Sequence, residues 1–301
     1  MKTKFSILIA FFAVIACSNV FGQMVILSGS EQGAYYEFVD DINYVLKDGD
    51  GEPFVNKTTS GAAYNFNQLT DPKTPFKVAF MQMDYLYFMQ GMDNQNNTKK
   101  TSEIKVLMPL ANEEIHFVTK KSSGLNKLSD LDSSKVVAIG SKNQGTYATA
   151  NFIKDGSRIF WSSRNIHFDE ALKGLYLDKV DAFVFVGSAP IVKLNIDPRG
   201  LREPLTLLEL DDVNDWAKDY ERDTIYMDDY KWLDKDIPTY GVKTVIIVNE
   251  SKLTTADREE LQKMMNGLKN NYDKLVKDGH PKWKDVEFDS WDKADWPKIR
   301  L

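Results

Sequence analysis

Short apolar runs alternate with longer amphipathic segments over most of the chain, starting at residue 24. Residues 24–27 are typical of a buried strand, and residues 34–47 carry apolar side chains at three- and four-residue intervals, which predicts a helix. The same alternation predicts further strands over residues 54–58, 77–81, 105–110, 114–120, 136–140, 179–186 and 242–248. Strands that alternate with helices form parallel α/β layers, so we expect an α/β fold.

Further helices are predicted over residues 62–69, 84–89, 168–177 and 254–277, and from residue 147 onward. Asp84 is placed to cap the second of these, and Thr254 or Thr255 to cap the long one. Residues 91–103 are polar, which predicts a flexible loop. The tail from residue 279 is expected to wrap around the surface. It carries three tryptophans among charged residues: Trp283, Trp291 and Trp296.

Residues 1–22 are predicted to be a signal peptide. Two early lysines precede an apolar run over residues 5–16 that is too short to cross a bilayer comfortably. Modest side chains before the junction suit cleavage after Gly22. The run that ends at Cys17 resembles a lipobox, which leaves lipid anchoring through Cys17 as the alternative. Either way we expect a periplasmic location.

Composition narrows the class of protein. Cys17 is the only cysteine, so the mature chain has no intramolecular disulfide and must be held together by its core. The chain has 38 basic and 44 acidic residues and a net charge of −6, which argues against a nucleic-acid partner. Removing about 22 residues leaves enough chain for two lobes of ordinary size. We expect a monomer that needs no cofactor.

Catalytic patterns are absent from the sequence. Hydrolysis or group transfer needs a nucleophile with a base, or a metal. The three histidines, His116, His167 and His280, do not have metal-ligand spacing, and no G-x-S-x-G elbow or Walker loop occurs. His116 is expected to be a structural residue in a strand. We therefore expect a binding protein and not an enzyme, with no catalytic residue and no metal site.

Three predicted strand-to-helix corners share one composition. Residues 28–33, 59–62 and 141–146 each follow an apolar strand and are rich in glycine, hydroxyl or amide side chains. In open α/β sheets, ligands bind at the carboxyl ends of strands. Helix N-termini there present free N–H groups and a partial positive charge, which suit a carboxylate. The corners therefore predict a binding site for a small anionic group.

The order and spacing of these motifs resemble those of a known family. In the first half the motifs are Ser28–Tyr36, Thr59–Ala62 and Phe80–Asp84. In the second half they are Gly124–Leu131, Val137–Ser141, Gly145–Thr146, Phe168–Leu172, Val180–Phe183 and Gly187–Pro190. Over residues 24–275 the chain resembles the TAXI-type solute receptors of TRAP transporters, and Gly124–Leu131 is similar to that family's G-x-x-S-L-x-D-L segment.

The resemblance implies two Rossmann-like α/β lobes joined by two crossing hinge strands, with a ligand cleft between the lobes. The first lobe would comprise residues 23–115 and 245–301, and the second residues 116–244. The strands over 114–120 and 242–248 would make the crossings. Ligand-binding residues carried over from the family are Ser30, Gly33, Tyr36, Ser60, Gly61, Gln82, Asp84, Ser141, Asn143, Gly145, Thr146, Gly187 and Ser188.

The function implied is capture of a small acidic or amino-acid-like solute, of glutamate or dicarboxylate type, by cleft closure and its delivery to a TRAP-type membrane permease. Glu31 stands where the family more often has a small residue. This carboxylate would repel an anion or pair with an ammonium group on the ligand, which favours an amino acid; the other interpretation is that it points to solvent. A ligand sensor that reports to a partner protein, or an extracytoplasmic enzyme on the same fold, are the alternatives.

Overall fold

The computed structural model describes residues 23–49, 51–288 and 296–301. The predicted signal peptide, with Cys17, and Trp291 of the tail lie outside the described residues. In the part of the chain that is described, no helix combines the length and the apolar character needed to cross a membrane.

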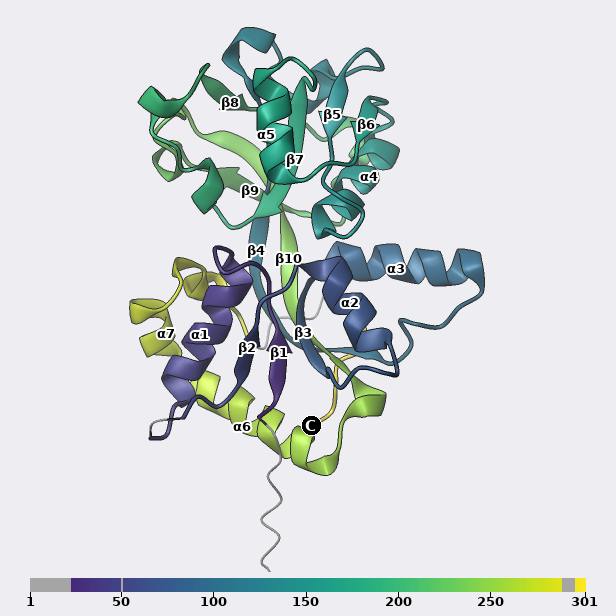
Figure 1. The fold of residues 1–301 in the computed structure, drawn as a ribbon, viewed down its shortest axis with the longest axis vertical. Coiled ribbons are helices and arrows are strands. Elements are labelled where there is room, and N and C mark those ends of the chain that lie inside the picture. Colours follow the sequence, from purple (N-terminus) through teal and green to yellow (C-terminus); the bar gives the residue numbers. More distant parts are fainter. Residues whose placement is uncertain (1–22, 50, 289–295) are drawn as a thin grey trace, which may run out of the picture.

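Figure 1 shows two α/β bodies, one above the other, which the long strands β4 and β10 connect. All strands belong to one sheet with the order β2-β1-β3-β10-β4-β7-β5-β6, and β8 and β9 pair with β4 and β10. The strands are β1 (Val25–Leu27), β2 (Val55–Lys57), β3 (Val78–Gln82), β4 (Ile104–Lys120), β5 (Val136–Ala138), β6 (Ser162–Arg164), β7 (Ala182–Gly187), β8 (Leu205–Leu207), β9 (Glu221–Ile225) and β10 (Ile237–Asn249). The predicted α/β fold is confirmed.

The lower body of Figure 1 packs helices on both faces of its strands. Helices α1 (Ala34–Leu46), α6 (Thr255–Asn270) and α7 (Tyr272–Asp278) cover one face, and α2 (Ala62–Thr70) and α3 (Met83–Asn96) lie on the other. Along β3, Phe80 belongs to the first core and Met81 to the second. This alternation follows from the two-residue period of a strand, so a continuous apolar run fills both layers.

The upper body repeats the arrangement with fewer helices. Parallel strands β5, β6 and β7 lie between α4 (Gly145–Ser157) and α5 (Phe168–Tyr176). Val184 faces the α4 side, and Phe183 faces the α5 side, where it packs edge-on against Phe168. Each body therefore has a hydrophobic core on both faces of its part of the sheet.

The two long strands pass between the bodies where Asn112–Glu114 pairs with Gly241–Lys243 in antiparallel register. Gly241 is required there, because an added Cβ would lie 2.7 Å from Asn112 Cβ. Above this point β4 pairs with β7 and β8, and β10 pairs with β9. The two strands expected over 105–110 and 114–120 are one strand, and the crossing overlaps the first residues of the segments 114–120 and 242–248 expected to make it.

Helix boundaries differ from the sequence prediction in two places. Helix α3 continues into the first part of the expected polar loop and ends at Asn96, and its C-cap residue Asn97 adopts a left-handed conformation with φ 52°. The predicted single helix over 254–277 is two helices, because the chain leaves helical geometry at Asn271. The expected cap at Thr254 is present, and its side chain and that of Asp257 form a capping box.

The C-terminal tail does not simply wrap the surface, contrary to our expectation. Trp283 is fully buried in the core against α1, and its indole N–H donates to Asp41 Oδ2 at 2.7 Å. Trp296 is buried in the opposite core and donates to the Ile104 carbonyl oxygen at 3.0 Å. Charged neighbours masked this role in the sequence, because periodicity is not visible in so short and irregular a segment.

Replacing Trp283 with alanine should lower the free energy of unfolding by about 3–5 kcal/mol, because a large buried side chain and its hydrogen bond are both lost. Denaturant titration followed by circular dichroism measures the change. The matched control is Phe160→Ala, which removes an exposed aromatic side chain and should shift the value by no more than about 0.5 kcal/mol. Equal effects of the two variants would contradict a structural tail.

Candidate functional site

The two bodies are in direct contact at the start of helix α4. Gly145 is its first residue, and a Cβ added there would lie 1.4 Å from Gln82 Oε1 and 3.4 Å from Ala62 Cβ. Gln82 ends β3 and Ala62 begins α2, so strand-end corners of both bodies meet here. One turn further on, Ala148 is buried in the core formed by α2 and α3. The lobes are therefore closed on one another at this junction.

Asp84 fastens the junction with hydrogen bonds from the upper body. Its Oδ2 accepts from the Thr149 hydroxyl at 2.6 Å and from the Tyr220 hydroxyl at 3.2 Å. Burial raises the pKa of Asp84 to about 6, and the two hydroxyl donors oppose that shift. The sequence predicted Asp84 as a helix cap, but Gln82 occupies the N-cap position and Asp84 bonds across the junction instead.

Glu113 is a second buried carboxyl close to Asp84. Its Oε2 accepts from the Tyr35 hydroxyl and from Gln82 Nε2, each at 2.9 Å. Burial raises the pKa of Glu113 to about 7 against these two donors, and the charges of Glu114 and Asp84 raise it further. Glu113 lies on β4 where the strand passes between the bodies, so it forms part of the floor of the junction.

The junction is acidic and holds unsatisfied acceptors. Within the described ranges, no lysine, arginine or histidine forms an ion pair with Glu113 or Asp84. Buried atoms without a hydrogen-bond partner include Gln82 Oε1, Asp84 Oδ1 and Ser141 Oγ. Buried polar groups are normally paired, because an unpaired one costs about 1–3 kcal/mol. Oxygens without donors therefore concentrate where the lobes meet.

The residues that the sequence predicted to bind a ligand differ in how exposed they are to solvent. Those fully buried are Gln82, Asp84, Gly145, Thr146 and Gly187. Those partly exposed are Gly33, Tyr36, Gly61, Ser141 and Ser188. Those exposed are Ser30, Ser60 and Asn143. The structure brings Gln82 and Gly145 into contact; no ligand is present to test the rest, and the assignment of the set as ligand-binding stays a prediction.

Two of these residues have other roles in the closed structure. The Thr146 hydroxyl accepts a hydrogen bond from the Val186 N–H at 3.2 Å, which ties α4 to β7. The predicted set includes Tyr36, but it is the Tyr35 hydroxyl that bonds to Glu113 at the junction. The Tyr36 hydroxyl lies near Asp40, whose charge raises the pKa of the tyrosine. Glu31 is exposed to solvent.

Sequence reasoning missed Glu113, Tyr35, Thr149 and Tyr220. The available signal was the pair Glu113-Glu114, two acids in the middle of a seventeen-residue strand that is otherwise almost entirely buried. A buried strand has no reason to carry paired acids unless partners meet them. Thr149 and Tyr220 gave no such signal, because their partner lies more than sixty residues away in the chain.

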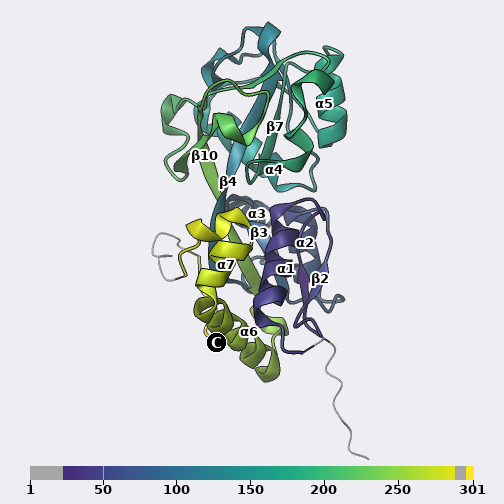
Figure 2. The ribbon, with the colours of Figure 1, turned by 90° about the vertical axis from the view of Figure 1, so that its left-hand side faces the viewer.

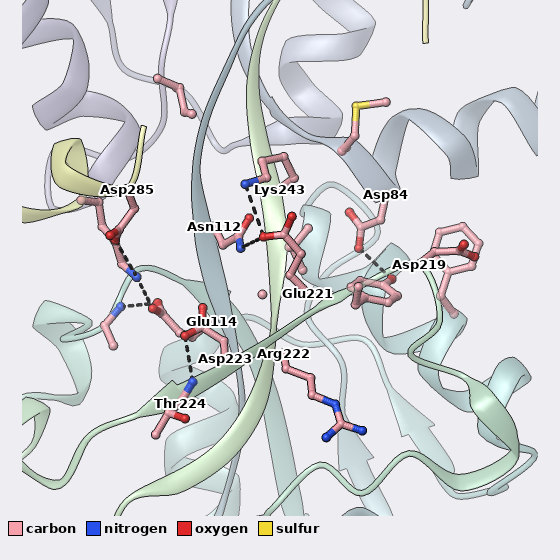
Figure 3. A pocket seen from close by; sticks show the side chains of 18 of the residues that line it. Asp84, Asn112, Glu114, Asp219, Glu221, Arg222, Asp223, Thr224, Lys243 and Asp285 are labelled. Carbon is pink, nitrogen blue, oxygen red and sulfur yellow. Dashed lines mark hydrogen bonds and ion pairs between the residues drawn. The ribbon is translucent and has the colours of Figure 1, made fainter. Parts of the chain in front are cut away.

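A groove of about 1620 Å³ runs along the connecting strands, and Figure 3 shows its polar lining. Asp84 is the only sequence-predicted residue among those that line it. Asn112 Nδ2 donates to Glu221 Oε2 at 2.6 Å, and Lys243 Nζ lies 3.6 Å from the same oxygen. These contacts join β4, β9 and β10 beside the crossing.

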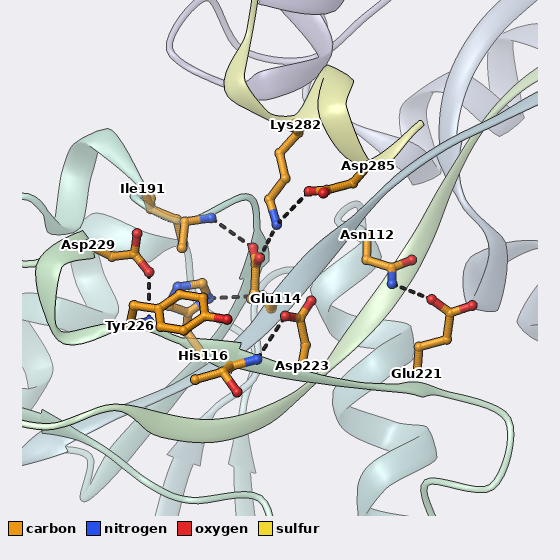
Figure 4. Close-up of polar contacts among 12 residues, drawn as sticks. Asn112, Glu114, His116, Ile191, Glu221, Asp223, Tyr226, Asp229, Lys282 and Asp285 are labelled. Atoms are coloured by element: carbon orange, nitrogen blue, oxygen red, sulfur yellow. Dashed lines mark hydrogen bonds and ion pairs between the residues drawn. The ribbon is translucent and has the colours of Figure 1, made fainter. Parts of the chain in front are cut away.

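Glu114 anchors the other side of the groove (Figure 4). Its carboxylate pairs with the Lys282 ammonium group and accepts from the Ala189 N–H at 2.8 Å. The C-terminal tail and the upper body therefore share one carboxylate. Next to it, buried His116 bonds to the Glu114 carbonyl oxygen at 2.9 Å and to the Tyr230 hydroxyl at 2.8 Å, and burial lowers its pKa to about 4. His116 is structural, as predicted.

The described ranges hold no assembled metal site. No cluster of three or more histidine, cysteine, aspartate or glutamate side chains there is placed to hold a metal ion. The buried acids of the junction bond to hydroxyl and amide donors. The geometry supports binding of a polar solute.

The chain belongs to the NMT1-like family, which matches residues 26–296. A search of curated protein sequences found no match to the chain. The fold is that of type II periplasmic substrate-binding proteins and of related effector-binding domains, and the finer assignment to TAXI-type receptors stays a prediction.

Three solved structures share this fold. The effector-binding domain of QuiR in complex with shikimate has a TM-score of 0.51 and 10% identity, covering 83% of this chain and 96% of that one. The substrate-binding protein of an amino acid ABC transporter has a TM-score of 0.51 and 13% identity, covering 86% and 100%. The ligand-binding component of an ABC-type import system from Staphylococcus aureus, solved with zinc, has a TM-score of 0.51 and 13% identity, covering 85% and 78%.

The raised pKa of Glu113 predicts a pH-dependent stability. The folded state holds a proton that the unfolded state releases above about pH 4.5, so this stabilisation is complete at low pH and is lost as the pH rises through about 7. Between pH 5 and 8, the free energy of unfolding of the wild type should fall relative to Glu113→Gln by roughly 2–3 kcal/mol. Urea titrations of both proteins across this pH range measure the difference in their free energies of unfolding. A difference that stays constant with pH would contradict the prediction.

Proposed function

We propose that the protein is an extracytoplasmic receptor that captures a small acidic or amino-acid-like solute between its two lobes. The observation that carries the proposal is the junction itself: Gly145 of one lobe meets Gln82 of the other, and Thr149 bonds to Asp84 across the gap. A ligand that touches both lobes favours closure by its differential contacts with the closed state. The lobes would divide at residues 115/116 and 244/245, close to the crossing.

The predicted corners would supply the donors for the solute's carboxylate. Helices α1, α2 and α4 begin at Ala34, Ala62 and Gly145, and none of the three has a side-chain cap for its first N–H groups. The first N–H groups of a helix without a side-chain cap suit an anion. Serine and threonine hydroxyls at the same corners, such as Ser30 and Ser60, would add donors at the rim. Micromolar affinity needs about 8 kcal/mol, which a few charge-assisted hydrogen bonds and partial desolvation supply.

Delivery of the captured solute to a TRAP-type permease completes the proposal. It rests on the resemblance of the corner motifs to TAXI-type receptors, and the predicted signal peptide would place the protein in the periplasm as a monomer. Reconstitution of the purified receptor with a candidate permease in vesicles tests this step. Solute uptake that depends on the receptor supports delivery; uptake that is the same without it would leave a receptor with another partner.

Gly145→Leu should hold the lobes apart, because its side chain would fill the space of Gln82 and contact Ala62. Small-angle scattering should give a larger radius of gyration for this variant than for the wild type. Its affinity for the solute that co-purifies with the wild type, identified by mass spectrometry and titrated back by calorimetry, should fall at least about tenfold, or about 1.4 kcal/mol.

Gly91→Leu is the matched control. It adds the same side chain to helix α3 at a position with no neighbour within 4 Å, so it should leave both measurements unchanged. Closure and affinity equal to the wild type in Gly145→Leu would refute the proposed binding mode. Conversion of the bound solute into another compound would point to an enzyme.

A further inference from the structure

We infer that Glu113, together with Gln82 and Asp84, forms a subsite for the protonated amine of the solute. The inference rests on the proposed receptor function and narrows its ligand class: solutes that carry a cationic nitrogen, and not plain dicarboxylates. Glu113 does not follow from the motifs in the sequence, where Glu31 was the only acid considered as a partner for a ligand ammonium group. The residues come from β4, β3 and α3, and they converge beneath the contact between the lobes.

The first argument is that two buried carboxyl groups have no basic residue to balance their charge. Glu113 and Asp84 are each at least nine-tenths buried, at 7% exposure, and in the described part of the chain neither has a basic partner. The titratable groups that face Glu113 are Tyr35 from α1, Asp84 from α3 and Glu114 on its own strand, all acidic. Burying a carboxylate without a counter-charge is expensive, and a ligand cation would relieve that cost.

The second argument is independent of charge and concerns acceptors. Gln82 Oε1 and Asp84 Oδ1 are buried without a hydrogen-bond partner, in side chains that are 5% and 7% exposed. Thr244 lies opposite Gln82 in the β3–β10 ladder, so the two side chains emerge on the same face of the sheet. An ammonium group offers three N–H donors and no acceptor, which matches such a set of oxygens.

The next residue of β4, Glu114, is an acid whose charge is balanced by a basic residue. Successive side chains of a strand point to opposite faces, and Glu114 therefore turns away from Glu113. Glu114 pairs with the Lys282 ammonium group and with a backbone N–H, as Figure 4 shows. Lys282 performs for Glu114 the role that the solute's ammonium group would perform for Glu113. Because Gly145 already contacts Gln82, the solute enters when the lobes separate.

Matched pairs of compounds test the subsite by calorimetry on the full-length mature protein. We choose L-glutamate with glutarate, L-leucine with 4-methylpentanoate, and cadaverine with pentane-1,5-diol; each pair differs by the cationic nitrogen. We expect the nitrogen-bearing member of at least one pair to bind at least about tenfold more tightly. In Glu113→Gln this preference should shrink to less than about threefold. The variant is isosteric, and its unfolding midpoint shows that it folds.

The pH dependence gives a second readout with opposite signs for the two ligand classes. A cation must displace the proton of Glu113, so its affinity should rise from pH 5.5 to 7 and then level off. A ligand carboxylate placed there would require the protonated acid, and its affinity would fall over the same range. Glu170→Gln is the matched control, because it removes an exposed carboxyl at the start of helix α5 in the other body and should leave both the preference and this slope unchanged.

Equal binding within every pair, full preference in Glu113→Gln, an affinity that falls with rising pH, or no binding by any nitrogen-bearing probe would each overturn the subsite. The Gly145→Leu experiment tests the receptor separately. If the affinity depends on closure but not on the cationic nitrogen, the amine subsite is refuted and the receptor function is retained. If the affinity depends on neither closure nor the cationic nitrogen, both the amine subsite and the receptor function are refuted.

Discussion

The antiparallel pairing of β4 with β10 is the constraint on which the rest of the structure depends. These two strands alone run through both halves of the sheet shown in Figure 1, and they exchange partners as they pass from one body to the other. The close approach of Gly241 to Asn112 fixes their register at the crossing. A change in the relative orientation of the two bodies would therefore bend or twist this pair, which passes between them in Figure 2.

That geometry explains why the polar groups of the junction matter more than their number suggests. Asp84 and Glu113 are both buried, and burial raises the pKa of both. In an apolar core such groups would be a defect. At a surface between two movable bodies they favour whatever closes the gap and supplies hydrogen-bond donors. In the closed structure the Thr149 and Tyr220 hydroxyls satisfy one oxygen of Asp84 and leave the other without a donor.

The back of the hinge has the opposite chemistry. Glu114 is neutralised by Lys282, and Glu221 lies near both Asn112 and Lys243, so acids there have partners within the chain. Lys282 belongs to the tail segment whose Trp283 is buried against α1. The tail therefore links the core of one lobe to the crossing strand, and its packing bears on how freely the hinge bends. Two adjacent glutamates on one strand thus serve two faces: one is compensated by the protein, and the other is left for a ligand.

The sequence by itself determined the layers of this protein. Apolar runs at strand length, helical spacing in residues 34–47 and the glycine-rich corners depend on neighbours in the chain, and those features appear where they were predicted. The sequence left undecided which far-separated side chains meet. Glu113, Tyr35 and Thr149 acquire their roles only when α1, β4 and α4 converge, and Trp283 and Trp296 become core residues only because an irregular tail folds back onto the sheet. The reason is physical: local patterns record burial and periodicity, whereas partnership between polar groups depends on tertiary distance, which no local pattern records.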